Sequence, residues 1–141
     1  MSADHVAKSS MSDREYANEN GTMQTFLPGT QYVLGNRLNL PLKECEERGL
    51  AFSMASDYNP NCPSLSIPFV GSLAVHRMGL NPLTALVSVT RNPGTTLSQN
   101  IEKHNGTIEI GRSSSILVLP SENVESWVSS FGTMNNLQMI N

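Results

Sequence analysis

Charged residues and cysteines are both scarce in this sequence, and each shortage excludes a class of protein. Charged side chains make up 15% of the 141 residues and the net charge is -3, so there is no basic surface of the kind that binds nucleic acid. The two cysteines, Cys45 and Cys62, form neither a CxxC pair nor a disulfide framework, and we expect reduced thiols. No apolar run approaches the ~20 residues of a membrane-spanning helix, and residues 1–5 lack the features of a signal peptide. We therefore expect a cytoplasmic protein that binds neither nucleic acid nor a membrane.

Strand and helix signals alternate over about the first 90 residues, which favours an α/β fold with a parallel sheet built from βα units. Buried strands are short apolar runs that end at turn residues such as Pro28-Gly29, and helices end at glycines such as Gly79. On these signals we expect strands at residues 2–6, 22–27 and 50–56, and helices at residues 12–21, 41–48, 68–78 and from residue 82 onward.

Two motifs mark the starts of expected helices. Ser12 and Glu15 have the spacing of a capping box, in which Ser12 is the N-cap. Asn81-Pro82 combines an N-cap with a proline at the first helical position. The charged stretches at residues 13–15 and 44–47 are expected to be solvated helix faces. The helix after Pro82 should bury one face, which carries Leu83, Leu86 and Val89.

The C-terminal part of the sequence has a different character. Short β segments are expected at residues 107–110 and 114–119 around Gly111, then a short helix with Trp127, then a strand at residues 137–140. We read this part as a small β appendage at residues 105–141, after an α/β unit at residues 1–104. A closed eight-stranded barrel takes roughly 250 residues, so about three parallel strands form only part of one.

Two of the expected strands end in groups that carry chemistry. In parallel α/β folds the site lies at the carboxyl ends of the strands, where this sequence places Asp4-His5 and Asp57. Burying the carboxylate of Asp57 after an uncharged run is costly unless it binds a cation or accepts hydrogen bonds. A metal ligand and a cap on the turn at Asn59 are equally good interpretations. His5 suits acid–base chemistry, although a lone histidine is more often structural.

The turn that follows Asp57 carries further polar groups. Asn59-Pro60-Asn61 is a rigid turn whose amides are able to bind a carboxylate or a carbonyl, but asparagine turns are common. Cys62 has no base placed beside it by the sequence, so a small loop residue is a better interpretation than a nucleophile.

Residues along nearly the whole chain resemble the imidazolonepropionase family of metal-dependent amidohydrolases. The most specific match is Ala55-Ser56-Asp57-Tyr58-Asn59-Pro60, which is similar to that family's (Thr/Ser)-Asp-(Phe/Tyr)-Asn-Pro motif. Three further segments carry the resemblance: the Asp-His pair within residues 2–6, Leu27-Pro28-Gly29, and the Gly-Thr-Ile-Glu-Ile-Gly turn at residues 106–111. The resemblance implies the C-terminal part of a (β/α)8 barrel followed by part of a small β-sandwich domain.

The resemblance also implies roles for five residues. Asp57 would bind one divalent metal ion, zinc or iron, and take a proton from the attacking water, while His5 would stabilise charge on the carbonyl oxygen of the substrate. Asn59 would help to hold the product, and Asn61 and Cys62 would contact the substrate through the loop. The implied reaction is hydrolysis of 4-imidazolone-5-propanoate to N-formimidoyl-L-glutamate in histidine degradation.

The family's other metal ligands are missing from this sequence, including the His-x-His pair of the first barrel strand. The alternative interpretation is therefore a catalytically inactive truncated remnant, or an incomplete gene model. As partners we expect the small-molecule substrate and either a homo-oligomer or association through open barrel edges. Such edges would belong to the apolar strands at residues 22–27 and 50–56.

Overall fold

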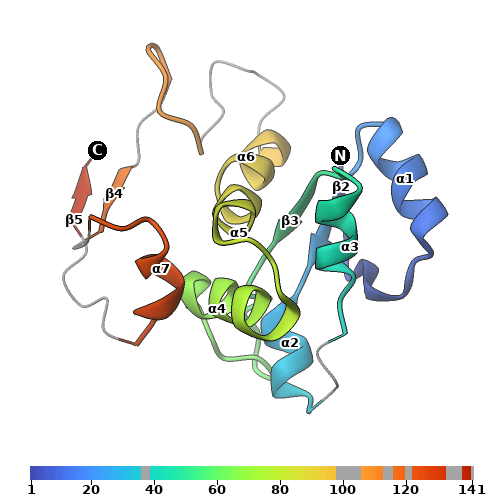
Figure 1. Ribbon diagram of the computed structural model, residues 1–141, viewed down its shortest axis with the longest axis horizontal. Helices are drawn as coiled ribbons and strands as arrows, with labels where there is room; N and C mark the ends of the chain where they lie inside the picture. The colour runs from blue at the N-terminus through green and yellow to red at the C-terminus, as the bar shows by residue number, and fades with distance from the viewer. Residues whose placement is uncertain (36–38, 98–105, 113–115, 120–121, 133–137, 141) are drawn as a thin grey trace.

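The computed structural model describes residues 1–35, 39–97, 106–112, 116–119, 122–132 and 138–140 (Figure 1). A three-stranded sheet and the helices around it form the larger part of the described chain, and a two-stranded sheet follows. The elements in chain order are β1 (Ser2–Asp4), η1 (Val6–Lys8), α1 (Met11–Glu19), β2 (Met23–Phe26), α2 (Pro28–Val33), α3 (Leu42–Glu47), β3 (Phe52–Met54), α4 (Ile67–Met78), α5 (Pro82–Val89), α6 (Arg91–Leu97), β4 (Ile116–Val118), α7 (Ser126–Ser129) and β5 (Gln138–Ile140).

The larger sheet is parallel and its strands lie in the order β1-β2-β3, as the βα pattern predicts. Because β2 is paired on both sides, the expectation that residues 22–27 form an open edge is wrong, and the edges are β1 and β3. The main chain of Ala55 donates to Phe26 O of β2, so by alternation the carbonyl of Phe52 faces away from β2. Asn92 Nδ2 of α6 donates to that carbonyl at 2.7 Å, which covers part of the β3 edge.

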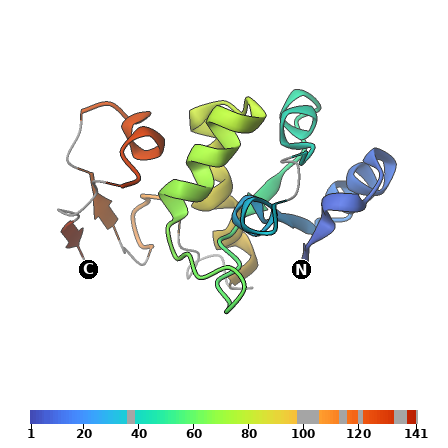
Figure 2. The same ribbon diagram turned by 90° about the horizontal axis from the view of Figure 1, so that it is seen from below.

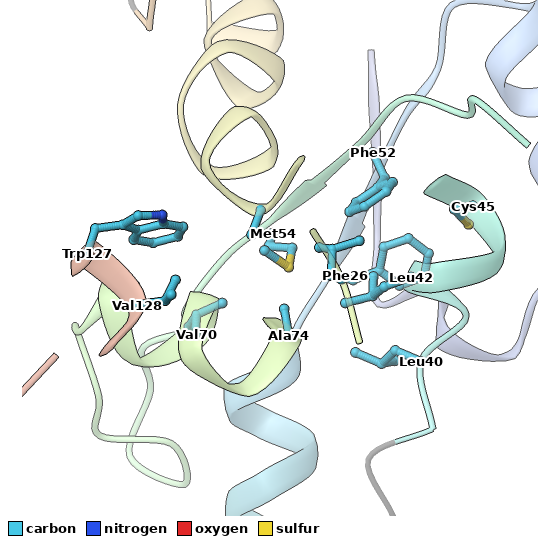
Figure 3. Close-up of a cluster of buried hydrophobic side chains, with 12 residues drawn as sticks. Phe26, Leu40, Leu42, Cys45, Phe52, Met54, Val70, Ala74, Trp127 and Val128 are labelled. Atoms are coloured by element: carbon cyan, nitrogen blue, oxygen red, sulfur yellow. The ribbon is translucent and has the colours of Figure 1, made fainter. Parts of the chain in front are cut away.

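The two faces of this sheet differ in polarity. The strand register puts Gln24, Phe26, Phe52 and Met54 on one face, where side chains from α3, α4 and α5 complete a hydrophobic core (Figure 3). Phe26 and Phe52 meet edge to face with ring centroids 5.7 Å apart. Burying each such side chain stabilises the fold by about 1.5–3 kcal/mol. The opposite face carries Asp4, Thr25 and Ser53, which are paired in register across all three strands.

Arg14 is buried, with 1% of its surface exposed, so the expected solvated face at residues 13–15 is wrong for this residue. Its guanidinium lies 4.9 Å from the centre of the Phe26 ring. It also donates to four oxygens around it, which belong to Val6, Ala7, Ser9 and Gln24. Burial lowers the pKa of Arg14, and the acceptors compensate the desolvated charge.

Helix starts differ from the sequence expectation in three places. The N-cap of α1 is Ser10 rather than Ser12, and Asp13 completes the capping box. Pro28-Gly29, which we expected to be a turn, opens α2, because a proline is compatible with the first turn of a helix. The helix α6 was not expected. In α5 the start at Asn81 is confirmed. Its most buried residues are Ala85 and Ser88, whereas Leu83 is exposed.

The β4–β5 pair and α7 lie at the end of the molecule away from α1, as both ribbon views show (Figures 1 and 2). The strands β4 and β5 are antiparallel, and α7 contains the expected Trp127. Residues 107–110 do not form the expected strand, and Ile108 and Ile110 are exposed. The proposed unit boundary at residues 104/105 lies outside the described residues, as do residues 114, 115 and 137. Across the described chain, every helix is too short or too polar to cross a membrane.

Candidate functional site

Two side chains from the ends of β1 and β3 meet above the sheet. His5 follows β1 directly, and Asp57 follows β3 after Ala55 and Ser56. Their closest atoms, His5 Nε2 and Asp57 Oδ1, are 3.8 Å apart. The strands are parallel, so their carboxyl ends share one edge of the sheet and residues distant in sequence come together there. The two groups attract when His5 is protonated.

Both residues adopt an unusual backbone conformation. Among the described residues, the non-glycine positions with positive φ are His5, at 59°, and Asp57, at 53°. The left-handed region costs a residue with a Cβ atom about 1–2 kcal/mol. Such strain persists where the surrounding structure determines it, and it concentrates at functional sites. The sequence therefore maintains a strained conformation at the same two positions that bring an imidazole and a carboxylate together.

Within the described residues, the carboxylate of Asp57 accepts a hydrogen bond through one of its two oxygens. Thr30 Oγ1, in the first turn of α2, donates to Asp57 Oδ2 at 2.7 Å. The other oxygen, Oδ1, faces His5. The side chain of Asp57 is 23% exposed and that of His5 is 64% exposed, so both remain accessible from solvent. This arrangement leaves one carboxylate oxygen available to a ligand.

The turn after Asp57 is stabilised by its own polar groups. Asn59 Nδ2 donates to the main-chain oxygen of Asp57 at 2.6 Å, and Asn59 Oδ1 accepts from the main-chain N–H of Asn61 at 2.9 Å. The main chains of Asn59 and Cys62 pair in an isolated bridge. Cys62 is buried, and its thiol donates to Ser56 O at 3.5 Å. The capping group in this turn is thus Asn59 rather than the carboxylate of Asp57.

A pocket of about 320 Å³ lies beside His5 and Asp57, and its wall includes Asp4, Thr25, Ser53 and Thr96. The hydroxyls of Thr25 and Ser53 are 2.9 Å apart on the polar face of the sheet. The sequence also singled out Asn59, Asn61 and Cys62. These three residues are not among the described residues that line the pocket. The structure thus brings two of the five sequence-predicted residues together at the pocket and places the other three in the adjoining turn.

Sequence reasoning did not single out Thr30, Thr25 or Ser53. Two signals for them are present in the sequence. Thr25 alternates with the buried Phe26 along β2, so it lies on the opposite face of the sheet. Thr30 follows Pro28-Gly29 in the segment that resembles the family motif, but its 2.7 Å bond to Asp57 depends on how α2 packs.

The described residues at this pocket supply part of a metal site. Asp57 Oδ1 offers a carboxylate oxygen of the kind that binds zinc or iron, and the imidazole of His5 lies beside it. A catalytic zinc site needs about three protein ligands. Within the described ranges, His, Cys, Asp and Glu side chains form no group of three that could hold a metal ion. A complete site would require ligands from outside these residues.

Comparison with known proteins identifies similar sequences. An imidazolonepropionase from Symbiobacterium thermophilum is 32% identical over 120 residues, which are 84% of this chain and 28% of that protein. One from Syntrophobacter fumaroxidans is 35% identical over 119 residues, 84% of this chain and 27% of that protein. One from a Geobacillus species is 27% identical over 141 residues, 99% of this chain and 32% of that protein. The chain thus spans about three-tenths of the length of these relatives. No family model matches it.

Proposed function

We propose that this chain, a relative of the imidazolonepropionases, forms the C-terminal part of a hydrolase that opens 4-imidazolone-5-propanoate to N-formimidoyl-L-glutamate in histidine degradation. One observation carries the proposal. His5 and Asp57, the two described non-glycine residues with positive φ, meet across the ends of β1 and β3. The similarity to imidazolonepropionases supports the same reaction class, a hydrolysis of a cyclic amide.

The architecture follows from this proposal. Three parallel strands in sequential order, each followed by a helix, are the repeating units of a (β/α)8 barrel. The polar face with Thr25 and Ser53 would line the interior, and the face with Phe26 and Phe52 would contact the surrounding helices. The β4–β5 pair would be part of a small β-sandwich domain.

We assign the chemical roles by what each side chain is able to reach. A zinc or iron ion, when bound, supplies Lewis acidity that polarises the ring carbonyl and acidifies a water molecule. Asp57 would be a ligand of that ion, and its carboxylate would accept a proton from the attacking water. His5, 3.8 Å away and more exposed, would stabilise the negative charge that develops on the carbonyl oxygen.

The turn at residues 59–62 would orient the substrate or the product. Asn59 already uses both ends of its side-chain amide within the turn. Its contribution would therefore include fixing the shape of the turn, with Asn61 and the main chain at Cys62 presented toward the ligand. This role is consistent with the position of the turn directly after Asp57.

The alternative is a chain with no activity of its own, and the incomplete donor set within the described residues favours it for the isolated polypeptide. We expect the purified 141-residue chain to show no turnover of imidazolonepropanoate. Turnover should appear when the chain is assembled with the remaining portion of the Symbiobacterium thermophilum relative and loaded with zinc or iron. Activity of the isolated chain that Asp57→Ala abolishes would refute the first expectation. An assembled, metal-loaded protein without Asp57-dependent turnover would refute the proposed function.

A further inference from the structure

We propose that Thr30 is a positioning residue that fixes the orientation of the Asp57 carboxylate, with one oxygen held by Thr30 and the other facing His5; the catalytic meaning of this role rests on the function proposed above. The hydroxyl of Thr30 donates to Asp57 Oδ2 at 2.7 Å, a strong contact for an O–H···O bond to a carboxylate. The opposite oxygen, Oδ1, is then directed to His5 Nε2 at 3.8 Å. One hydroxyl on α2 thereby sets the orientation of a group that follows β3.

The need for such a contact follows from the freedom of an aspartate side chain. The torsion that turns a carboxylate has a broad, roughly two-fold profile, so an unrestrained Asp57 carboxylate would turn over a wide range of angles. The main chain of Asp57 is fixed separately, because its carbonyl accepts from Asn59 Nδ2 at 2.6 Å and its φ is 53°. That bond leaves the carboxylate free to turn. The contact from Thr30 therefore determines an orientation that the backbone does not.

The anchor itself is well held. Leu27, Pro28 and Gly29, which lead into Thr30, are all buried. A Cβ atom at Gly29 would lie 3.5 Å from Ser56 O and 3.7 Å from Cys62 Sγ, so the first turn of α2 lies against the segment that carries Asp57. Threonine is β-branched, so its χ1 is restricted to few rotamers, one of which directs the hydroxyl to Asp57. The packing of the first turn of α2 thus keeps Thr30 within reach of Asp57.

Thr30 acts through Asp57 rather than on a ligand. It is not among the described residues that line the 320 Å³ pocket, whereas Asp57 is. Thr25, by contrast, lines the pocket, and its hydroxyl lies 2.9 Å from that of Ser53. These two threonines give a matched pair for experiment, because each makes a side-chain hydrogen bond near the site and only Thr30 is bonded to Asp57.

The test compares Thr30→Val, Thr30→Ser and Thr25→Val in the isotope-labelled 141-residue chain. From NMR, three-bond couplings report the χ1 rotamer of Asp57, and its carboxyl-carbon shift reports the hydrogen bond that the carboxylate accepts from Thr30. We expect one conformer in the unsubstituted chain, in Thr30→Ser and in Thr25→Val, and averaging over conformers in Thr30→Val. A single conformer retained in Thr30→Val, or averaging already present in the unsubstituted chain, would overturn the proposal.

A second arm measures the consequence for catalysis in the assembled, metal-loaded enzyme. Thr30→Val should lower kcat about 10-fold with little change in KM, because misplacement of a reacting group slows the chemical step. Thr30→Ser should restore most of the loss. An assembled enzyme without any turnover would refute the proposed function and leave the positioning role to be decided by the couplings. A turnover unaffected by Thr30→Val would refute the positioning role alone.

Discussion

His5 Nε2 and Asp57 Oδ1 lie 3.8 Å apart although their strands are not hydrogen-bonded to one another. The strand β2 separates β1 from β3, so the two side chains meet over the carboxyl end of β2, where Leu27 contributes to the same pocket. Each residue has a positive φ, His5 directly after β1 and Asp57 three residues after β3 ends, and this conformation changes the direction of the chain within one residue. The encounter therefore depends on two strained residues and not on strand pairing alone.

This relationship predicts different consequences for the two residues. In the assembled enzyme, Asp57→Asn should reduce turnover by at least ~10²-fold, because a metal ligand and a proton acceptor are lost together. Metal content should fall as well. His5→Ala should reduce turnover while the metal content changes little, because His5 is assigned to the substrate oxygen. Turnover and bound metal are measured on the same preparations. Equal loss of metal in both variants would mean that His5 is a ligand.

The sequence predicted that His5 and Asp57 lie at the same edge of the sheet, because that placement follows from strand polarity. Asp4-His5 and Asp57 follow apolar runs, and parallel strands place their carboxyl ends together. The contact between Thr30 and Asp57 could not be predicted from the sequence, because it depends on how the first turn of α2 packs. That turn was missed since Pro28-Gly29 also fits a strand end. For the turn at Asn59, a cap by Asp57 was one of two equal interpretations of that aspartate, and the capping bonds come from the side chain of Asn59 instead.

The capping of α1 provides a stability test of a corrected expectation. Ser10→Ala should destabilise the chain by about 1 kcal/mol, because Ser10 Oγ accepts from the main-chain N–H of Asp13. Ser12→Ala should have a smaller effect, since Ser12 contacts only the hydroxyl of Ser10 among the described hydrogen bonds. Urea unfolding followed by circular dichroism measures both. A larger loss of stability in Ser12→Ala than in Ser10→Ala would mean that Ser12 is the N-cap, as the sequence suggested.

The same cap predicts a pH effect. Hydrogen bonds from the side chain and the main chain of Ser10 hold the pKa of Asp13 below its usual value of 3.8. A carboxyl with a lowered folded-state pKa contributes stability above its unfolded pKa, and that contribution is lost as the pH falls through the folded value. The difference in stability between the unsubstituted chain and Asp13→Asn should therefore be present at pH 6 and shrink below about pH 4. A difference that grows on acidification would contradict this assignment.

Arg14 should be important for stability despite its charged neighbours in sequence. Arg14→Met keeps the apolar stem but removes the Arg14 donor from the oxygens of Ala7 and Ser9 and one of the two donors to Val6 O, which still accepts from Ser9 N–H, so we expect a loss of about 2–4 kcal/mol. Arg48→Met is the control, because the ion pairs of Arg48 with Glu15 and Glu44 are exposed and should contribute little. Denaturant midpoints measure both variants, and similar shifts would contradict the anchoring role of Arg14.

Such a buried arginine is difficult to infer from sequence. Asp13-Arg14-Glu15 has the composition of a solvated face, and the acceptors around Arg14 are mainly backbone oxygens, which leave no side-chain pattern. The opposite error occurred at residues 107–110, where alternating Ile108 and Ile110 suggested a strand. Both side chains are exposed, so no partner surface is present in the described chain to fix them as a strand. Patterns of polarity predict burial only when the packing partner is known.

The docking of α7 on α4 depends on one glycine. A Cβ atom at Gly71 would lie 2.2 Å from the indole ring of Trp127, which is 4% exposed and packs beside Val70 and Val128 in the core (Figure 3). Alanine is favoured over glycine within a helix by about 1 kcal/mol, so a loss of stability in Gly71→Ala has to come from this contact. We expect a net loss of about 1–3 kcal/mol, because the indole has to move out of a closely packed core.

Tryptophan fluorescence tests this contact directly, because Trp127 is the one tryptophan in the sequence. In Gly71→Ala the emission of Trp127 should shift to longer wavelength as the indole becomes hydrated, while the sheet and its core keep their circular dichroism. Gly132→Ala is the matched control, since a Cβ atom there meets nothing within 4 Å. Unchanged emission in Gly71→Ala together with unchanged stability would mean that Trp127 does not pack on Gly71 in solution, and that the β4–β5 end of the chain is held to α4 by other contacts.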